Sequence, residues 1–148
     1  MLLRTVKDVN TMIEDLDTLS DGVYKIGHGS FSELIVQYPI IDEEIRQARL
    51  SYDDKKSIQQ FLLSKRIELR NIEKFKISIS FEPSYEFIDK MYQWVNSYVK
   101  CNVVLDIEVN PDIVGGAEMS FRGFHKDCSF RAGLRKYFDS YKSVHELL

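Results

Sequence analysis

The sequence predicts an α+β protein in which an N-terminal helical region precedes a small β-α-β-β-α domain with a three-stranded mixed sheet. Three observations lead to this class. Apolar residues recur at helical spacing through much of residues 1–73. Residues 75–81 and 103–109 alternate apolar and polar side chains, as half-buried strands do. Glycine and proline residues separate these patterns where connections are needed. We therefore expect two domains, residues 1–73 and residues 74–148.

The helical region opens with a set of apolar residues on one helical face, and this first helix is expected to end near Gly22. The set is Leu2, Val6, Val9, Ile13, Leu16 and Leu19. Asp42 is expected to cap a second helix, and residues 57–72 resume helical spacing. Residues 23–40 are irregular, with a short helix or strand expected within residues 31–38.

The second domain begins with the strongest strand pattern of the chain, in which Phe75, Ile77 and Ile79 alternate with polar residues. Pro83 and Ser84 then open a helix with an apolar stripe. The stripe contains Phe87 or Ile88, Met91, Val95 and Tyr98. A strand, a helix and a second strand place the two strands parallel through a right-handed crossover.

A third strand is predicted from a hairpin. Residues 103–109 and 117–121 both alternate, and Pro111 and the pair Gly115-Gly116 separate them. We expect a positive φ at one of the glycines and a third strand antiparallel to the second. The residues expected to be largely buried are Phe75, Ile77, Ile79, Leu105, Ile107, Met119 and Phe121.

The last predicted element is a helix that follows two capping candidates. Asp127 and Ser129 offer side-chain oxygens to the first turn of this helix. Its apolar side carries Phe130, Leu134, Phe138 and Tyr141. Amphipathic helices at both ends of the chain exceed what a three-stranded sheet covers easily, which favours a protein-binding surface.

A spaced set of residues in this domain resembles a known signature. The set reads Pro-x-Ile-x-Gly-Gly, then Asp-x-Ser, then Leu, at Pro111, Ile113, Gly115, Gly116, Asp127, Ser129 and Leu134. It is similar to the C-terminal signature of the delta subunit of F-type ATP synthases, whose mitochondrial relative is the oligomycin-sensitivity-conferring protein. The resemblance covers roughly Phe75 to Phe138, under half of the chain.

The resemblance implies a non-catalytic subunit of the peripheral stalk, which needs no cofactor and lies peripherally at the cytoplasmic face of an energy-coupling membrane. Its partners in that family are the b-type stalk subunits and the alpha subunits of the catalytic head. The residues expected to contact a partner are Met91, Val95, Tyr98, Phe130, Phe138 and Tyr141. The family grips the head with a six-helix bundle, whereas residues 1–73 predict only two to four helices.

Composition limits the other function classes. A hydrophobic fraction of 44% suffices for a folded core, and the net charge of −3, with both signs mixed, argues against nucleic-acid binding. No apolar run approaches the ~20 residues of a membrane span, so we expect no membrane insertion. Cys101 and Cys128 lack a CxxC spacing, which favours reduced thiols in an intracellular protein.

Several catalytic or ligand-binding interpretations compete with the structural one. Residues 24–31 superficially resemble the glycine-rich loop of a kinase, but the other kinase motifs are missing. His28, His125 and His145 show no metal-ligand spacing, and Asp106 and Glu108 are expected on the polar face of the sheet, opposite lysines such as Lys76. No catalytic, cofactor or metal residue is therefore expected.

Two alternatives stay open beside the stalk subunit. One is a protein-binding adaptor or regulatory domain in an unrelated assembly. The other is a small hydrolase or transferase that uses Cys128, His125 and Asp127, which requires these three side chains to converge in a pocket.

Overall fold

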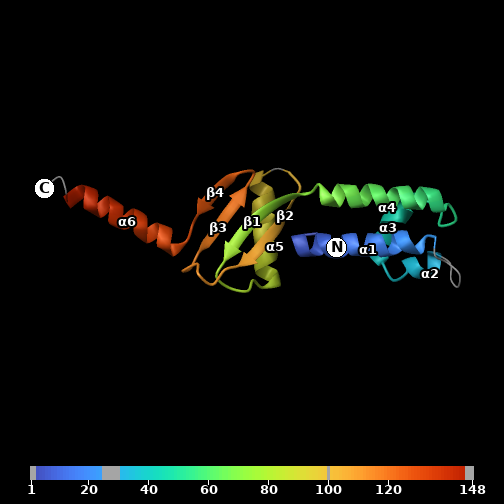
Figure 1. The fold of residues 1–148 in the computed structure, drawn as a ribbon, viewed down its shortest axis with the longest axis horizontal. Helices are drawn as coiled ribbons and strands as arrows, with labels where there is room; N and C mark the ends of the chain where they lie inside the picture. Colours follow the sequence, from blue (N-terminus) through green and yellow to red (C-terminus); the bar gives the residue numbers. More distant parts are fainter. Residues whose placement is uncertain (1–2, 25–30, 100, 146–148) are drawn as a thin grey trace. The chain divides into compact units, whose positions relative to one another are not determined.

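The computed structural model describes residues 3–24, 31–99 and 101–145, with side chains described up to residue 139. The chain divides into two compact units. The first contains Lys7–Ile72, and the second contains Glu73–Leu148 together with the short segment Arg4–Val6. Within the described ranges the chain is mixed α/β, with six helices and one four-stranded sheet (Figure 1).

The first unit is helical. Its elements are α1 (Val6–Gly22), α2 (Phe31–Ile35), α3 (Pro39–Gln47) and α4 (Lys55–Arg70). Their apolar faces meet in one buried cluster around Leu16, Leu19, Ile45, Ile58 and Leu62. The helix predicted to end near Gly22 does end there, and the short element expected within residues 31–38 is the helix α2.

The predicted cap at Asp42 is wrong. The helix α3 begins at Pro39, because proline has the φ of a first helical turn and lacks the N–H that would stay unpaired there. Asp42 is instead buried inside α3, where its carboxylate accepts a hydrogen bond from the Tyr52 hydroxyl and pairs with Arg46 at 2.7 Å. The next helix, α4, is capped by Asp54, which accepts from the backbone N–H of Ser57 at 3.1 Å.

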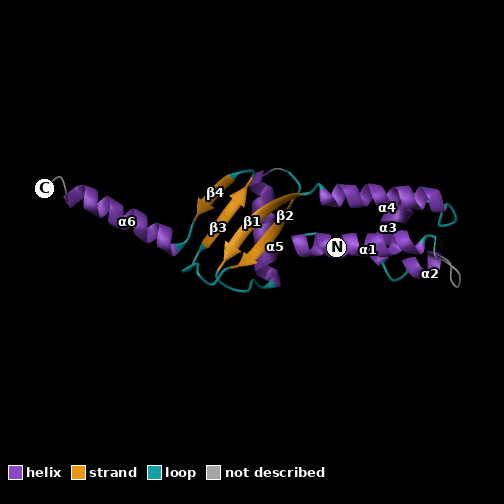
Figure 2. Cartoon of the chain, viewed as in Figure 1, coloured by secondary structure: helices purple, strands orange, loops and turns teal. Residues whose placement is uncertain are grey.

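The second unit holds all the described strands (Figure 2). Its elements are β1 (Glu73–Ile79), α5 (Tyr85–Val99), β2 (Val103–Val109), β3 (Ala117–Phe121), β4 (Phe124–Asp127) and α6 (Phe130–His145). The sheet has the order β2-β1-β3-β4. The predicted parallel pairing of the first two strands is confirmed, with Phe75 opposite Leu105. Ser84 caps α5 by accepting from the backbone N–H of Phe87 at 3.2 Å.

The predicted hairpin between the second and third strands is wrong, because β3 pairs antiparallel with β1 rather than with β2. Residues 110–116 form a connection long enough to pass the end of β1, where the N–H of Asn110 bonds to the carbonyl of Ile79 at 2.7 Å. On the far side of β1, Phe121 stacks on Phe75 with ring centroids 5.5 Å apart. The strand with the strongest alternation, β1, therefore lies between β2 and β3.

The sheet also has a fourth strand that the prediction lacked. Strands β3 and β4 join through Arg122 and Gly123, whose φ values are 47° and 81°. Positive φ at both positions of a two-residue turn matches the twist of the flanking strands. Every residue of β4 is exposed, so it lacks the buried apolar alternation by which the other strands are recognised.

The core of the second unit lies between α5 and the sheet (Figure 1). Of the residues predicted to be buried, Phe75, Ile77, Ile79 and Leu105 are buried. The remaining three, Ile107, Met119 and Phe121, are half-buried at the margin of the same cluster.

The turn between β3 and β4 is tied to the start of β1. The guanidinium of Arg122 donates to the carboxylate of Glu73 from Nε and Nη2 at distances of 2.7 to 3.1 Å. These hydrogen bonds hold the pKa of the Glu73 carboxyl below its usual value. The same guanidinium lies 5.0 Å from the centre of the Phe121 ring.

The hydrogen bonds between Arg122 and Glu73 predict a pH-dependent loss of stability in the variant Arg122→Gln. A carboxyl group with a lowered pKa in the folded state stabilises the fold above its unfolded pKa, and this contribution disappears as pH falls through the folded pKa. In urea unfolding, Arg122→Gln should therefore be less stable than the parent at about pH 7, and the difference should shrink toward about pH 3. A difference that is constant with pH would mean that Arg122 acts through its contact with Phe121 instead.

Candidate functional site

Four residues of the spaced signature, Gly115, Gly116, Asp127 and Ser129, meet at the start of α6. There, the connection between β2 and β3 lies against the connection between β4 and α6. The N–H of Cys128 bonds to the carbonyl of Ala117 at 2.9 Å, and the N–H of Phe130 bonds to the carbonyl of Gly115 at 3.1 Å. We call this junction, formed by Gly115, Gly116, Cys128, Ser129 and Phe130, the α6 corner.

Within the α6 corner, the backbone of Gly116 lies closest to the backbone of Cys128 and Ser129. Its φ is +82°, and a Cβ at this position would lie 2.3 Å from the carbonyl oxygen of Cys128 and 2.9 Å from the Cα of Ser129. Gly115 also has a positive φ, +64°, but a Cβ there would meet only Phe130, at 3.8 Å. The predicted positive φ is therefore confirmed at both glycines, and only Gly116 is also required by close backbone packing.

Asp127 and Ser129 fix the first turn of α6, as predicted. The hydroxyl oxygen of Ser129 accepts from the backbone N–H of Ala132 at 3.2 Å, which is an N-cap hydrogen bond. The carboxylate of Asp127 accepts from the backbone N–H of Ser129 at 2.8 Å. Hydrogen bonds from the side chain and then the backbone of Ser129 lower the pKa of the Asp127 carboxyl below its usual value.

Three further signature residues have separate places. Ile113 is buried, with 6% of its surface exposed, whereas Pro111 is exposed in the same connection. Arg131 links this connection to α6, because its Nη2 donates to the carbonyl of Asp112 at 3.2 Å. Leu134 lies one turn along α6 from the corner and is 41% exposed.

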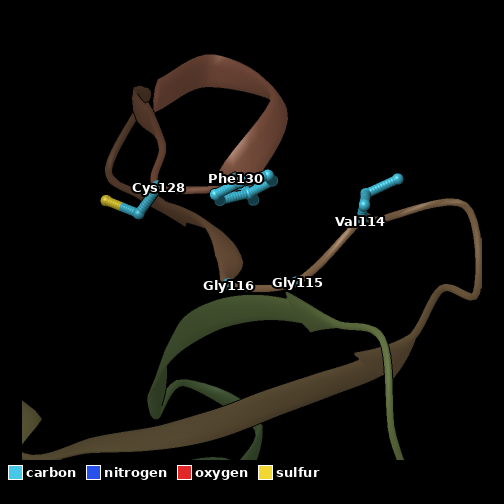
Figure 3. Close-up of a pocket in the computed structure, with 5 residues that line it drawn as sticks. All are labelled: Val114, Gly115, Gly116, Cys128 and Phe130. Atoms are coloured by element: carbon cyan, nitrogen blue, oxygen red, sulfur yellow. The ribbon is translucent and has the colours of Figure 1, made fainter. Parts of the chain in front are cut away.

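An open hollow of about 410 Å³ lies at the α6 corner. Apart from the two glycines it is lined by Val114, Cys128 and Phe130 (Figure 3). Val114 and Phe130 are both more than half exposed, and the Cys128 side chain points away from Phe130. The walls are mainly apolar, so the hollow offers apolar contact area.

An exposed apolar row continues from this hollow along α6. Phe130, Leu134 and Phe138 follow one another at four-residue spacing, so they form one ridge of the helix. Their exposed fractions are 60%, 41% and 56%. We call these three residues the α6 ridge. The predicted side of this helix also included Tyr141, whose side chain lies outside the described residues.

The helix α5 uses its apolar stripe differently. Val95 is fully buried against the sheet, so its side chain belongs to the domain core and its assignment as a partner contact is wrong. Met91 packs partly buried against the same core, and its assignment stays a prediction. Tyr98 is instead 72% exposed and lies beside Trp94, with ring centroids 5.2 Å apart.

The proposed catalytic group of Cys128, His125 and Asp127 is not assembled. The Nδ1 of His125 lies 3.0 Å from the hydroxyl of Ser120, across the strand pair β3–β4. Asp127 is occupied by Ser129, and Cys128 lines the hollow at the α6 corner. The side chains of His125 and Asp127 therefore have different hydrogen-bond partners, and neither of these partners is Cys128.

The other acidic and histidine residues considered as catalytic or metal-binding candidates are as follows in the structure. Glu108 forms an ion pair with Lys76 at 2.9 Å, as the cross-strand prediction expected. The described residues contain no group of three or more His, Cys, Asp or Glu side chains placed to hold a metal ion. His28, with most of the glycine-rich segment 24–31, and the side chain of His145 lie outside the described residues.

Among the described helices, none is both long and apolar enough to cross a membrane. Comparison of the sequence with protein-family models and with curated proteins found no match.

The α6 corner predicts unequal costs for three alanine substitutions. Gly115→Ala and Gly123→Ala introduce a Cβ at positive φ without a close contact, and each should cost about 1–2 kcal/mol of unfolding free energy. Gly116→Ala adds an overlap with the backbone of Cys128, so its cost should rise to about 2–5 kcal/mol. Urea unfolding measures all three. Equal costs would show that the close approach at Gly116 does not constrain the fold.

Proposed function

We propose that this protein is a non-catalytic docking subunit that binds a helix of a partner protein along α6. We further propose that the partner is the b-type subunit of the peripheral stalk of an F-type ATP synthase. The protein would then act as a static link in that stalk, at the cytoplasmic face of the energy-coupling membrane.

The observation that carries the docking role is the exposure of the α6 ridge. An amphipathic helix of a folded domain ordinarily buries its apolar stripe, as α5 does with Val95. The α6 ridge leaves about half of each of two phenylalanine side chains and a leucine exposed to water. Because each of them is already partly buried, covering the rest against a partner would contribute roughly half of the full transfer free energy of such a side chain, about 1 kcal/mol each. A ridge at four-residue spacing also fits the groove of another helix.

The α6 corner supports the choice of partner. Five of the seven signature residues lie in the two connections that meet there, Asp127 is the last residue of β4, and Leu134 lies one turn further along α6. Four of these residues, Gly115, Gly116, Asp127 and Ser129, hold the first turn of the helix that carries the exposed ridge. The resemblance to the delta subunit supports a b-type helix as the ligand.

Contact with the alpha subunits rests on the resemblance alone. The described part of the first unit has four helices, whereas the family uses six for this contact. An adaptor domain in an unrelated assembly would use the same exposed ridge, so the identity of the bound protein separates the two functions.

Co-purification tests the proposed function. A tagged copy of the chain, expressed in its native host and purified in mild detergent, should recover b-type and alpha subunits of the F-type synthase. In the variant Phe138→Ser the recovery should fall roughly fivefold, because covering the exposed half of the phenyl ring contributes about 1 kcal/mol. Quantitative mass spectrometry of the bound proteins measures the change.

The matched control is Phe124→Ser on β4. Phe124 is 81% exposed, so this substitution removes the same ring from a site outside α6. Its recovery of partner subunits should equal that of the parent. Recovery of other proteins without any F-type subunit would contradict the stalk assignment, and equal losses in the two variants would contradict docking through α6.

A further inference from the structure

The charge on α6 differs from that of the chain as a whole. The helix Phe130–His145 has four basic residues and one acidic residue, whereas the complete chain has a net charge of −3. The one acidic residue is Asp139, four positions after Arg135 and three after Lys136. In the described part of the chain neither of these two cations forms an ion pair, with Asp139 or with any other acidic residue.

The two cations lie on different sides of the helix. Each residue of an α-helix is rotated by about 100° from the one before it. Arg135 is therefore about 60° from Phe138 and about 100° from Leu134, beside the α6 ridge. Lys136 is about 160° from both, on the opposite face. Arg131 lies on the same flank as Arg135, but its guanidinium already donates to the carbonyl of Asp112.

Arg135 is thus an exposed guanidinium without an acidic partner at the margin of an exposed apolar ridge. A guanidinium binds a carboxylate through two parallel hydrogen bonds, and such charge pairs at the rim of an interface select partners and fix their register. The unpaired charge at this margin is complementary to acidic residues that flank the apolar stripe of another helix.

We infer that the α6 ridge receives an acidic amphipathic helix whose carboxylates face Arg135. This inference rests on the proposed docking function and adds the charge of the partner. A helix that lies on an anionic membrane surface has its cations over the whole polar face. Among the described side chains of α6, Arg135 is the one cation beside the ridge that no other group binds, since Arg131 donates to the carbonyl of Asp112; one such cation pairs with a row of carboxylates on a helix better than with a lipid surface.

Two synthetic peptides test this charge preference with the full chain. Both carry the same leucine stripe at helical spacing, and one has glutamates beside the stripe where the other has lysines. Fluorescence anisotropy should show about tenfold tighter binding of the glutamate peptide at low salt. The difference should shrink at about 0.5 M salt, because added ions screen exposed charges.

Two variants locate the effect. Arg135→Glu should abolish or reverse the preference for the glutamate peptide. Lys136→Glu makes the same change of charge on the opposite face, and it should change the preference by no more than about twofold. Circular dichroism checks that both variants keep the fold of the parent.

The outcomes separate this inference from the function on which it rests. If the parent bound both peptides with equal affinity and Phe138→Ser bound neither, the preference for an acidic partner would be contradicted and the docking of a helix on α6 would still be supported. Equal effects of Arg135→Glu and Lys136→Glu would also contradict that preference, since only net charge would matter. Binding to phosphatidylglycerol vesicles without binding to either peptide would overturn both in favour of a lipid surface.

Discussion

The contact of Gly116 with the backbone of Cys128 and Ser129 determines how the second unit presents its last helix. At this point the connection between β2 and β3 lies directly against the start of α6, at a distance that leaves no room for a Cβ. The caps made by Ser129 and Asp127 and the hydrogen bond from Phe130 to Gly115 then fix the first turn. The direction of α6 is therefore set by backbone contacts at its origin.

This arrangement separates the stability of α6 from the burial of its apolar side chains. Most helices in proteins are held by the packing of their apolar face. Here, an N-cap hydrogen bond and two backbone contacts hold the first turn, while the α6 ridge stays exposed. A helix held in this way keeps its apolar ridge available to a partner, and the partner need not displace any part of the core.

Much of the fold could be predicted from the sequence because its signals are local. The alternation of Phe75, Ile77 and Ile79 identifies β1, and a crossover helix requires β2 to be parallel to it. The caps at Ser129 and Asp127 follow from their position before an apolar helical pattern.

The pairing of β3 could not be predicted because it is not local. Residues 110–116 permit either a hairpin with β2 or a passage to the far side of β1, and the packing of Phe121 on Phe75 favours the passage. A signal for β4 is present in Gly123, which lies two residues after the end of β3 and permits a tight turn.

The candidate site could be predicted only in part, because the sequence does not show which apolar faces are covered within the domain. The helices α5 and α6 have the same amphipathic pattern, and this pattern does not distinguish a face that meets the core from one that meets a partner. Val95 and Phe138 were thus both assigned to a partner, yet only Phe138 is exposed. The sequence does not single out Arg135 among the charged residues of the helix. Only the structure shows that it has no acidic partner and that the apolar residues beside it are exposed.

The docking role of α6 is tested most directly by a photocrosslinking residue, such as p-benzoylphenylalanine, placed at position 134 in the native host. Position 134 is the middle of the α6 ridge. The molecule that is crosslinked there is therefore the one that covers this face of the helix. We expect crosslinks to a helix of a b-type stalk subunit, absent when the same residue replaces Phe124. Crosslinks from position 134 only to the sheet of the same chain would contradict docking through α6.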